Sequence, residues 1–435
     1  MRSGAKKQTL MLTAVNGAVR ALGLGMRVML SRMLGAEIMG IMELAQSVHM
    51  VIIAPLTSGL PAAVSRLTAK ADPANRQHPL WAGLSIARTA SLLLIPLLLI
   101  ASPTLARMTG DARVLPSLWF SAPCVLILGY SAVYNGYCYG TGASLLPAGS
   151  ELVEQIARFL ITFGMLCLLR PLTAAWTAAV PVLATLLAEV LGLIYVLHAL
   201  KLPRRICGNA IRGCRSAVVE LAFPVTLSRL IQTVLRSLTA VLIPLRLQSS
   251  GLTSAEATAR LGMLNGMVMP ILMLPGVFTS ALSMVSLPRI AKAEEQPQEL
   301  KRLLLLCACS CLPFAALCAV GIYLAAPFLA AQVYRLPELS ALFRSCAMLT
   351  LLTAAGHLTG SVLSALGLQK SSLWISTAVS ACTLGLTWLW AADPALRIHG
   401  VIRAMYIGNA LTLLLSVFRL LRWRKRAFTG GDKSA

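Results

Sequence analysis

Four arginines stand inside apolar stretches of this sequence, in two pairs of equal spacing. Arg20 and Arg27 interrupt an apolar run near the amino terminus, and Arg229 and Arg236 interrupt another in the second half. Seven residues span about two turns of an α-helix, so the side chains of each pair lie on nearly one face. An arginine at the centre of a bilayer costs about 2.5–3.5 kcal/mol on insertion scales. Guanidinium groups are fixed cations with several donors, so the chemistry they offer is the binding of an anion.

The arginines could instead have a structural role, in ion pairs with the acidic residues of the apolar stretches. Glu43, Glu189 and Glu220 are candidates for ion pairs inside a helical bundle, because intramembrane charges usually face the interior and are often paired. Four arginines outnumber these three acids, which leaves positive charge for a ligand. Glu154 and Arg158 lie four residues apart on one helical face and are predicted to pair with each other, with a coupling role as the alternative.

The composition places these residues in a membrane. Hydrophobic residues make up 57% of the 435 positions and charged residues only 12%, whereas a soluble domain carries about 25% charged residues. The formal net charge of +23 is high enough for a nucleic-acid-binding protein. However, the basic residues fall between apolar runs instead of gathering on one charged surface, so we expect no nucleic-acid partner.

Windows of about 20 residues, the length of a membrane-spanning helix, divide the chain into twelve candidate spans. The loops predicted to be cytoplasmic contain the clustered lysines and arginines, and the opposite loops contain only scattered cations such as Arg107, Arg113, Arg170 and Arg335. This asymmetry follows the positive-inside rule and predicts a multi-pass membrane protein with both termini in the cytoplasm. The spans lie near residues 9–32, 38–63, 80–103, 114–139, 149–169, 174–199, 216–245, 261–287, 302–328, 339–366, 371–391 and 399–420.

The two halves of the chain resemble each other. Each half opens with a helix that carries the paired arginines, followed by "GAE" in the first half and "SAE" in the second. Parallel six-helix repeats are a transporter architecture, with the binding site at the repeat interface. We therefore predict a six-helix lobe over 1–200, a basic cytoplasmic linker over 201–215, a second six-helix lobe over 216–421 and a basic cytoplasmic tail over 422–435.

Several longer segments resemble a known family. They are "RMLGAEIMGIMELAQSVHMVIIAPLTSGLPAAVSRL" (32–67), "VEQIARF" (153–159), "LAFPVTLSRLIQTVLRSLTAVLIPLRLQ" (221–248), "LGMLNGMVMPILMLPGVFTSALSMVSLPRIAKA" (261–293) and "GHLTGSVLSALGLQKSS" (356–372). They look like the stage V sporulation protein B branch of the polysaccharide-flippase superfamily, which also contains lipid II flippases and multidrug extruders. The resemblance covers nearly the whole chain and rests on the order of the motifs.

The resemblance implies a fold class, a substrate and a site. The fold would be an all-α polytopic membrane protein of about twelve helices, in two six-helix lobes related by a pseudo-two-fold repeat. The function would be movement of an undecaprenyl-diphosphate-linked sugar from the inner to the outer leaflet by alternating access. Arg20 and Arg27 are the nearest match to the cavity arginines of lipid II flippases, and Arg229 and Arg236 are expected to face the same cavity. Many members have fourteen spans, whereas twelve are predicted here, so the path of the lipid tail is open.

Two other functions compete with a flippase. A cation-coupled multidrug extruder would need buried carboxylates, for which Glu43, Glu154 and Glu189 are candidates, and a membrane scaffold for wall assembly would need no charged site. We expect no enzyme activity, cofactor or metal site, because the sequence has no P-loop and no nucleophile–base or metal-ligand pattern. The expected partners are an anionic diphospho-lipid-linked saccharide, membrane lipids and cell-wall synthesis proteins. We expect a monomer.

Overall fold

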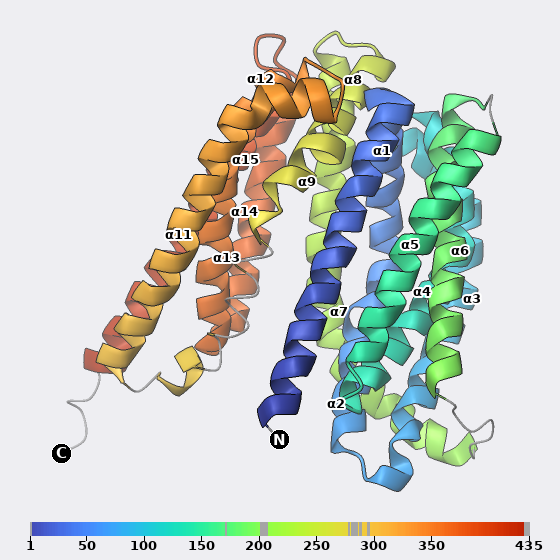
Figure 1. Cartoon of the computed structure of the whole chain (residues 1–435), viewed down its shortest axis with the longest axis vertical. Helices are drawn as coiled ribbons and strands as arrows, with labels where there is room; N and C mark the ends of the chain where they lie inside the picture. Colours follow the sequence, from blue (N-terminus) through green and yellow to red (C-terminus); the bar gives the residue numbers. More distant parts are fainter. Residues whose placement is uncertain are drawn as a thin grey trace. The chain divides into compact units, whose positions relative to one another are not determined.

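The computed structural model describes residues 2–169, 172–200, 208–276, 279, 286, 289–293 and 296–429. Within these ranges the chain is almost entirely helical and contains no β-strand (Figure 1). The chain divides into two compact units, Met1–Val241 and Leu242–Ala435, which are taken one at a time below.

In its described residues, the first unit is built from six complete helices and most of a seventh. Short 3-10 turns at Pro73–Asn75 and Ala112–Val114 precede its third and fourth helices. Most of the helices are 24 residues or longer, which is enough to cross a bilayer. They are α1 (Arg2–Thr57), α2 (Gly59–Lys70), α3 (Gln77–Met108), α4 (Leu115–Gly140), α5 (Leu145–Leu168), α6 (Ala174–Leu200) and α7 (Gly208–Ser249), the last of which continues into the second unit.

Helix α1 consists of two antiparallel limbs that meet at Gly35. Gly35 has φ 77° and ψ 177°, which is not helical. The Arg27 guanidinium lies 2.7 Å from the Glu43 carboxylate, sixteen positions later. Sixteen residues of unbroken helix would separate the two Cα atoms by about 24 Å, too far for their side chains to meet. The chain therefore reverses at Gly35 and forms the two separate spans predicted over 9–32 and 38–63 (Figure 1).

Helix α4 lies at the centre of the first unit. It packs against α2, α3 and α6, and α5 covers α6 from another side. Small residues allow this close packing, as is common between membrane helices. A Cβ on Gly136 of α4 would lie 2.5 Å from the Pro61 carbonyl oxygen of α2. The apolar core around it includes the fully buried Val64, Leu80 and Val133.

Helix α7 is attached to the first unit at two points. A Cβ on Gly59 would lie 2.2 Å from the Ala222 carbonyl oxygen of α7, so only glycine admits this approach. Farther along, the Ser237 hydroxyl donates a hydrogen bond of 2.6 Å to the Ser47 carbonyl of α1. These contacts explain why the boundary between the two compact units falls inside α7, after Val241, and not at the predicted linker. The linker lies partly outside the described residues, and the predicted lobes 1–200 and 216–421 remain a prediction.

The second unit contains shorter and more broken helices. Tyr334 is fully buried beside η4, and its hydroxyl donates a hydrogen bond of 3.0 Å to the Met267 carbonyl in η3. Helix α15 packs against α13 and α14, and α11 packs against α13. The elements are α8 (Ser254–Leu261), the π-helix η3 (Gly262–Val268), α9 (Met269–Leu272), α11 (Pro297–Phe328), the π-helix η4 (Leu329–Val333), α12 (Leu339–Cys346), α13 (Leu349–Ala365), α14 (Gln369–Trp390) and α15 (Ile398–Thr429).

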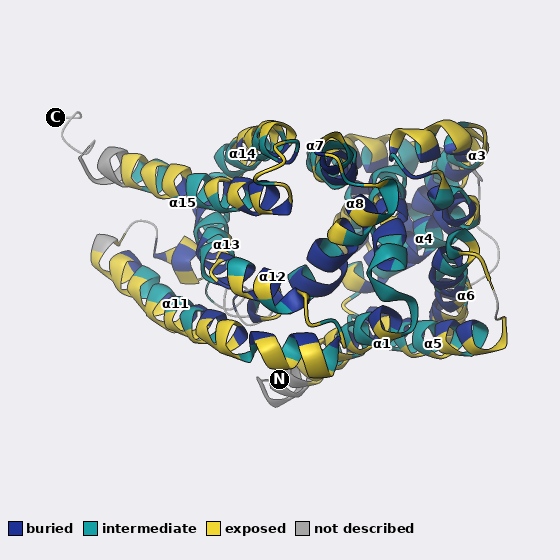
Figure 2. Cartoon of the chain, turned by 90° about the horizontal axis from the view of Figure 1, so that it is seen from above, coloured by how far each residue is buried: buried dark blue, intermediate teal, exposed yellow. Residues whose placement is uncertain are grey.

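The described residues contain nine segments that are long and apolar enough to cross a membrane, and the first of them, Met11–Lys70, holds two predicted spans. The predicted span over 149–169 corresponds to α5, which carries three charged residues, Glu151, Glu154 and Arg158. The predicted span over 261–287 begins in the π-helix η3 and runs beyond the described residues. Exposed residues run along several of these helices (Figure 2). They include large apolar side chains, for example Ile100 at 79% and Leu324 at 70%. Apolar side chains exposed on this scale are unfavourable in water but are stable in the hydrocarbon of a bilayer. The chain is therefore a multi-pass membrane protein.

Candidate functional site

Helix α1 carries the first predicted pair of arginines on its amino-terminal limb, where Leu and Met residues surround them in an unbroken helical run. Arg20 is exposed. Arg27 is half-buried, with its side chain 38% exposed, and it pairs with Glu43, whose side chain is 18% exposed. The structural role that the sequence left open is therefore found at Arg27, whose charge is balanced by a neighbouring carboxylate.

Helix α7 carries the second pair. Arg229 and Arg236 are both exposed. Within the described part of the chain, the side chains of Arg20, Arg229 and Arg236 have no carboxylate within ion-pair distance. Glu220 lies on the same helix, is also exposed, and pairs with none of the described arginines. Three of the four predicted arginines thus have no acidic partner among the residues that the structure describes.

The exposure of these three arginines indicates what surrounds them. They lie within the apolar segments Met11–Lys70 and Gly213–Ser249. A guanidinium group facing hydrocarbon is so costly that intramembrane arginines nearly always face protein or a water-filled space. This cost makes water or a polar ligand the expected neighbour of these three side chains. All four arginines belong to the unit Met1–Val241, and the predicted shared cavity between the lobes stays a prediction.

A second group of charges lies buried between α5 and α6. The Arg158 guanidinium is 3.2 Å from the Glu189 carboxylate of α6. Glu154, one turn before Arg158 on α5, accepts a hydrogen bond of 2.7 Å from the Ser150 hydroxyl. Glu154 is only 9% exposed and Glu189 only 6%. We refer to Ser150, Glu154, Arg158 and Glu189 as the α5–α6 charge cluster.

The predicted pairing of Glu154 with Arg158 is wrong. Arg158 pairs instead with Glu189, because α6 packs along α5 and brings a carboxylate from a different helix within reach. Gly192 of α6 makes room for the other carboxylate, since a Cβ there would lie 2.2 Å from the Glu154 Oε1. Helical spacing identified the shared face of Glu154 and Arg158, but the partner of Arg158 came from the neighbouring helix.

A third charged group surrounds Arg113, one of the scattered cations of the predicted outer loops. Its guanidinium group contacts Asp111 at 2.7 Å and 2.9 Å and also contacts Glu37 next to the Gly35 reversal. The Asp111 side chain additionally accepts from the Arg113 backbone N–H, which starts the 3-10 turn. The Asp–x–Arg spacing could have indicated the local half of this group, whereas nothing local indicated Glu37.

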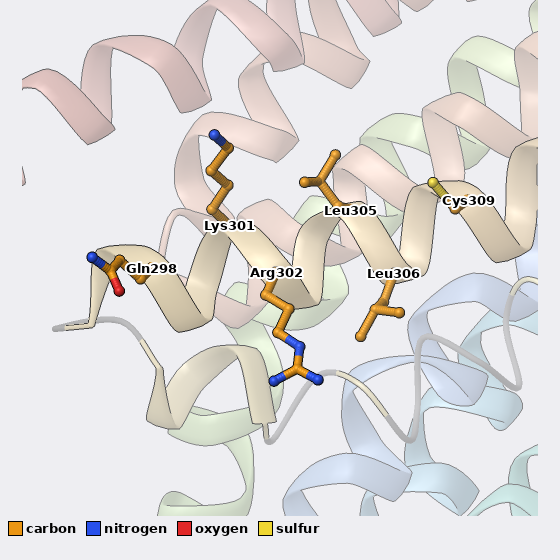
Figure 3. Close-up of a pocket in the computed structure, with 6 residues that line it drawn as sticks. All are labelled: Gln298, Lys301, Arg302, Leu305, Leu306 and Cys309. Carbon is orange, nitrogen blue, oxygen red and sulfur yellow. The ribbon is translucent and has the colours of Figure 1, made fainter.

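A shallow depression follows one face of α11, and Figure 3 shows the residues that line it. Lys301 and Arg302 both line the depression, and in this view their side chains point away from each other (Figure 3). Leu305, Leu306 and Cys309 continue the depression. Among the described residues there is also no group of three His, Cys, Asp or Glu side chains that could hold a metal ion. The arginines of α1 and α7 remain the candidate site.

Comparisons with known proteins agree with a membrane transport fold. The stage V sporulation protein B of Bacillus subtilis (strain 168) is 27% identical over 428 residues, which cover 94% of this chain and 82% of that protein. An inward-facing multidrug resistance MATE family transporter of the MOP superfamily superposes with a TM-score of 0.74 at 19% identity, covering 96% of both chains. The lipid II flippase MurJ in an inward closed conformation superposes with a TM-score of 0.75 at 14% identity, covering 94% of this chain and 87% of that one.

These likenesses confirm the predicted fold class, an all-α polytopic membrane protein of about twelve helices in two lobes. The structural neighbours are transport proteins, not enzymes. The family model for polysaccharide biosynthesis proteins matches residues 5–294, which include all but the first four residues of the first unit and every predicted site arginine. This chain therefore belongs to the polysaccharide biosynthesis protein family.

Proposed function

We propose that this protein is a flippase that moves an undecaprenyl-diphosphate-linked sugar from the inner to the outer leaflet by alternating access. The observation that carries the proposal is the presence of three exposed arginines, Arg20, Arg229 and Arg236, inside membrane-spanning helices and without a carboxylate partner among the described residues. Unpaired cations at this depth need an anion to offset their cost, and the headgroup supplies one.

A diphosphate matches these side chains in charge and in geometry. It leaves a strongly hydrated surface when it enters the membrane, so its oxygens need replacement donors. Each guanidinium group offers a planar fork that pairs bidentately with phosphate oxygens, and its charge does not depend on pH. Arg27, which already pairs with Glu43, would keep its limb of α1 in place and contact the headgroup less directly.

The similar proteins support this class of substrate. One solved neighbour is described as a lipid II flippase, and the similar protein of Bacillus subtilis is named for sporulation. Both descriptions are compatible with a lipid-linked cell-wall or polysaccharide precursor. We further propose that the protein resides in the bacterial cytoplasmic membrane with both termini in the cytoplasm, as the distribution of lysines and arginines predicts.

The alternative function is a cation-coupled multidrug extruder, which the likeness to MATE transporters and the buried carboxylates of the α5–α6 charge cluster favour. An extruder of organic cations would be expected to line its pathway with acidic residues. The exposed charges on α1 and α7 are instead mainly basic, so they would repel an organic cation and attract a phosphorylated headgroup.

The decisive experiment is translocation in proteoliposomes with three kinds of substrate. Fluorescent undecaprenyl diphosphates with different sugars test the proposal, an undecaprenyl monophosphate tests the need for the diphosphate, and an organic cation dye tests the alternative. We expect movement of the diphosphate lipids, weaker movement of the monophosphate and none of the dye. Transport of the dye alone would favour the extruder, and movement of no substrate would favour the scaffold.

A matched pair of variants connects the result to the site. Arg236→Ala removes an exposed arginine of α7 and should reduce the translocation rate roughly tenfold to a hundredfold. Arg260→Ala removes an exposed arginine of α8 that lies 3.8 Å from Glu338, outside the membrane-spanning segments, and should leave translocation unchanged. Equal activity of both variants would contradict the assignment of Arg236 to the substrate site.

A further inference from the structure

One broad side of helix α11 changes from polar to apolar along its length. The residues that line the shallow depression described above recur every three or four positions, which places them along one side of the helix. The first of them supply an amide and two cations, and the later ones are apolar or only weakly polar. In chain order these residues are Gln298, Lys301, Arg302, Leu305, Leu306 and Cys309 (Figure 3).

The apolar part of this side continues beyond the depression. Leu317, Val320 and Leu324 follow at helical spacing and are exposed. From Leu305 to Leu317 an α-helix rises about 18 Å, and half of a hydrocarbon core of about 30 Å is about 15 Å. The exposed apolar surface is therefore as long as the acyl chains of one leaflet. We refer to this side of the helix, from Gln298 to Leu324, as the α11 stripe.

The two cations of the α11 stripe have no acidic partner in the described part of the chain. Lys301 and Arg302 are both exposed, and no described carboxylate lies within ion-pair distance of either. Glu299 lies one turn before Arg302 and is itself exposed. The positive charge at the start of the stripe is therefore open to a ligand.

The α11 stripe begins at a basic end of the second unit. An apolar cluster packs the first turns of α11 against Leu366, at the end of α13, and Trp423 of α15. The cations that flank these contacts therefore lie at the same end. They outnumber the glutamates of this region, which are the exposed Glu299 and, outside the described residues, Glu294 and Glu295. The cations are Arg289, Lys292, Lys301, Arg302, Lys370, Arg419 and Arg422.

We propose that the α11 stripe binds an anionic phospholipid of the leaflet on the predicted cytoplasmic side. The headgroup phosphate lies beside Lys301 and Arg302, and an acyl chain follows the exposed leucines toward Leu317. Charge complementarity selects this occupant, because each basic side chain near the membrane surface favours an anionic lipid by about fivefold. The site is distinct from the arginines of α1 and α7, and its occupancy does not depend on the proposed transport function.

The lining residues also indicate which kind of anionic lipid binds. The side chains of Lys301 and Arg302 point away from each other in Figure 3, so they recognise negative charge and not one headgroup shape. A saccharide headgroup would need additional polar donors, whereas beyond Gln298 and the two cations the lining consists of leucines and a cysteine. A simple phospholipid therefore fits the stripe better than a lipid-linked sugar.

Native mass spectrometry of the purified full-length protein tests the selection by charge. The protein is mixed with equal amounts of dioleoyl phosphatidylglycerol and dioleoyl phosphatidylcholine, which share their acyl chains and differ in net charge. The wild-type protein should retain phosphatidylglycerol preferentially, and less so at higher ionic strength. Lys301→Gln or Arg302→Gln should lower the preference about fivefold, and the double variant about twenty-fivefold.

A matched control removes two cations elsewhere in the second unit. Arg260 and Arg335 are exposed and lie outside the membrane-spanning segments, so Arg260→Gln/Arg335→Gln should keep the preference. The thermal unfolding midpoint in phosphatidylcholine-containing micelles should be the same for both double variants, since all four side chains are exposed. An unchanged preference in Lys301→Gln/Arg302→Gln, or an equal loss in the control, would overturn the proposal.

Two further measurements separate the acyl chain from the headgroup and identify the occupant. Leu305→Gln/Leu306→Gln should lower the retention of both phospholipids and leave the preference between them unchanged. Undecaprenyl diphosphate should not displace phosphatidylglycerol at equal concentration. Displacement from the wild-type protein that is lost in Lys301→Gln/Arg302→Gln would assign the stripe to the transported lipid and overturn the phospholipid proposal. Because no step requires translocation, failure here is distinguishable from failure of the proposed function.

Discussion

The first unit places charged residues in the membrane in two opposite ways. Between α5 and α6 the charges are buried and matched to each other across the helix interface, with Arg158 against Glu189. On α1 and α7, Arg20, Arg229 and Arg236 are exposed and have no acidic partner in the described part of the chain. In the first arrangement an ion pair within the protein offsets the free-energy cost of burying the charges. In the second arrangement a bound ligand is expected to offset it. Stability and transport should therefore respond to mutations at different places.

The largest expected effect on stability comes from removing both acids of the buried cluster. The double variant Glu154→Gln/Glu189→Gln leaves Arg158 buried without a carboxylate, which should lower the free energy of unfolding by about 3–5 kcal/mol. Glu154→Gln alone keeps the pair of Arg158 with Glu189 and should cost less than about 1 kcal/mol. Unfolding in mixed detergent–SDS micelles measures both. If the double variant loses no more than the sum of the single variants, the two acids do not share Arg158.

Replacing the exposed arginines should impair transport without lowering stability. Replacing Arg20, Arg229 or Arg236 by Ala should reduce the translocation rate roughly tenfold to a hundredfold, because a charge-assisted hydrogen bond is worth about 1.5–3 kcal/mol. The free energy of unfolding should not fall. Arg→Lys should restore only part of the rate, since lysine lacks the planar fork. Full activity of the alanine variants would remove these residues from the site.

Arg27 lies between the two classes, because it is half-exposed and paired. A double-mutant cycle with Arg27→Ala and Glu43→Gln should give a coupling free energy of about 0.5–1 kcal/mol, at the upper end for ion pairs open to solvent. Arg27→Ala should also reduce translocation less than Arg236→Ala does. A coupling free energy near zero would mean that the 2.7 Å contact contributes nothing to stability.

The smallest effect on stability is expected for an ion pair that is open to solvent. Arg260 and Glu338 lie 3.8 Å apart, with side chains 44% and 67% exposed. Such a pair is screened by water, so Arg260→Ala should change the free energy of unfolding by less than about 0.5 kcal/mol. A larger loss, measured in the same micelle assay, would show that ion-pair energies in this protein do not follow exposure.

The hydropathy of the chain was sufficient to locate most of its helices. Each predicted span except 261–287 coincides with a described helix or pair of helices, because an apolar run of about 20 residues has few alternatives in a bilayer. The first two predicted spans are separated by Gly35, which adopts the positive φ that glycine tolerates.

The ion-pair partners of the charged residues could not be predicted from the sequence in this way. Helical spacing correctly grouped Glu154 and Arg158 on one face, but Glu189 lies thirty-one positions from Arg158 and reaches it only through the packing of α6 on α5. The contact between Gly59 and the Ala222 carbonyl oxygen is likewise a property of two helices distant in sequence. A single sequence shows which charges lie in apolar segments and are therefore costly to insert. The tertiary fold determines which group pairs with each of them.

The reversal at Gly35 has a consequence for how the protein enters the membrane. Alone, the amino-terminal limb of α1 would insert Arg20 and Arg27 at a combined cost of about 5–7 kcal/mol. Because the chain turns back at Gly35, Glu43 arrives beside Arg27 as soon as the second limb has left the ribosome. The two limbs can then partition into the bilayer together as a helical hairpin with one charge already neutralised. We therefore expect the two limbs to insert as a unit, and truncation between Gly35 and Glu43 should leave the first limb poorly inserted.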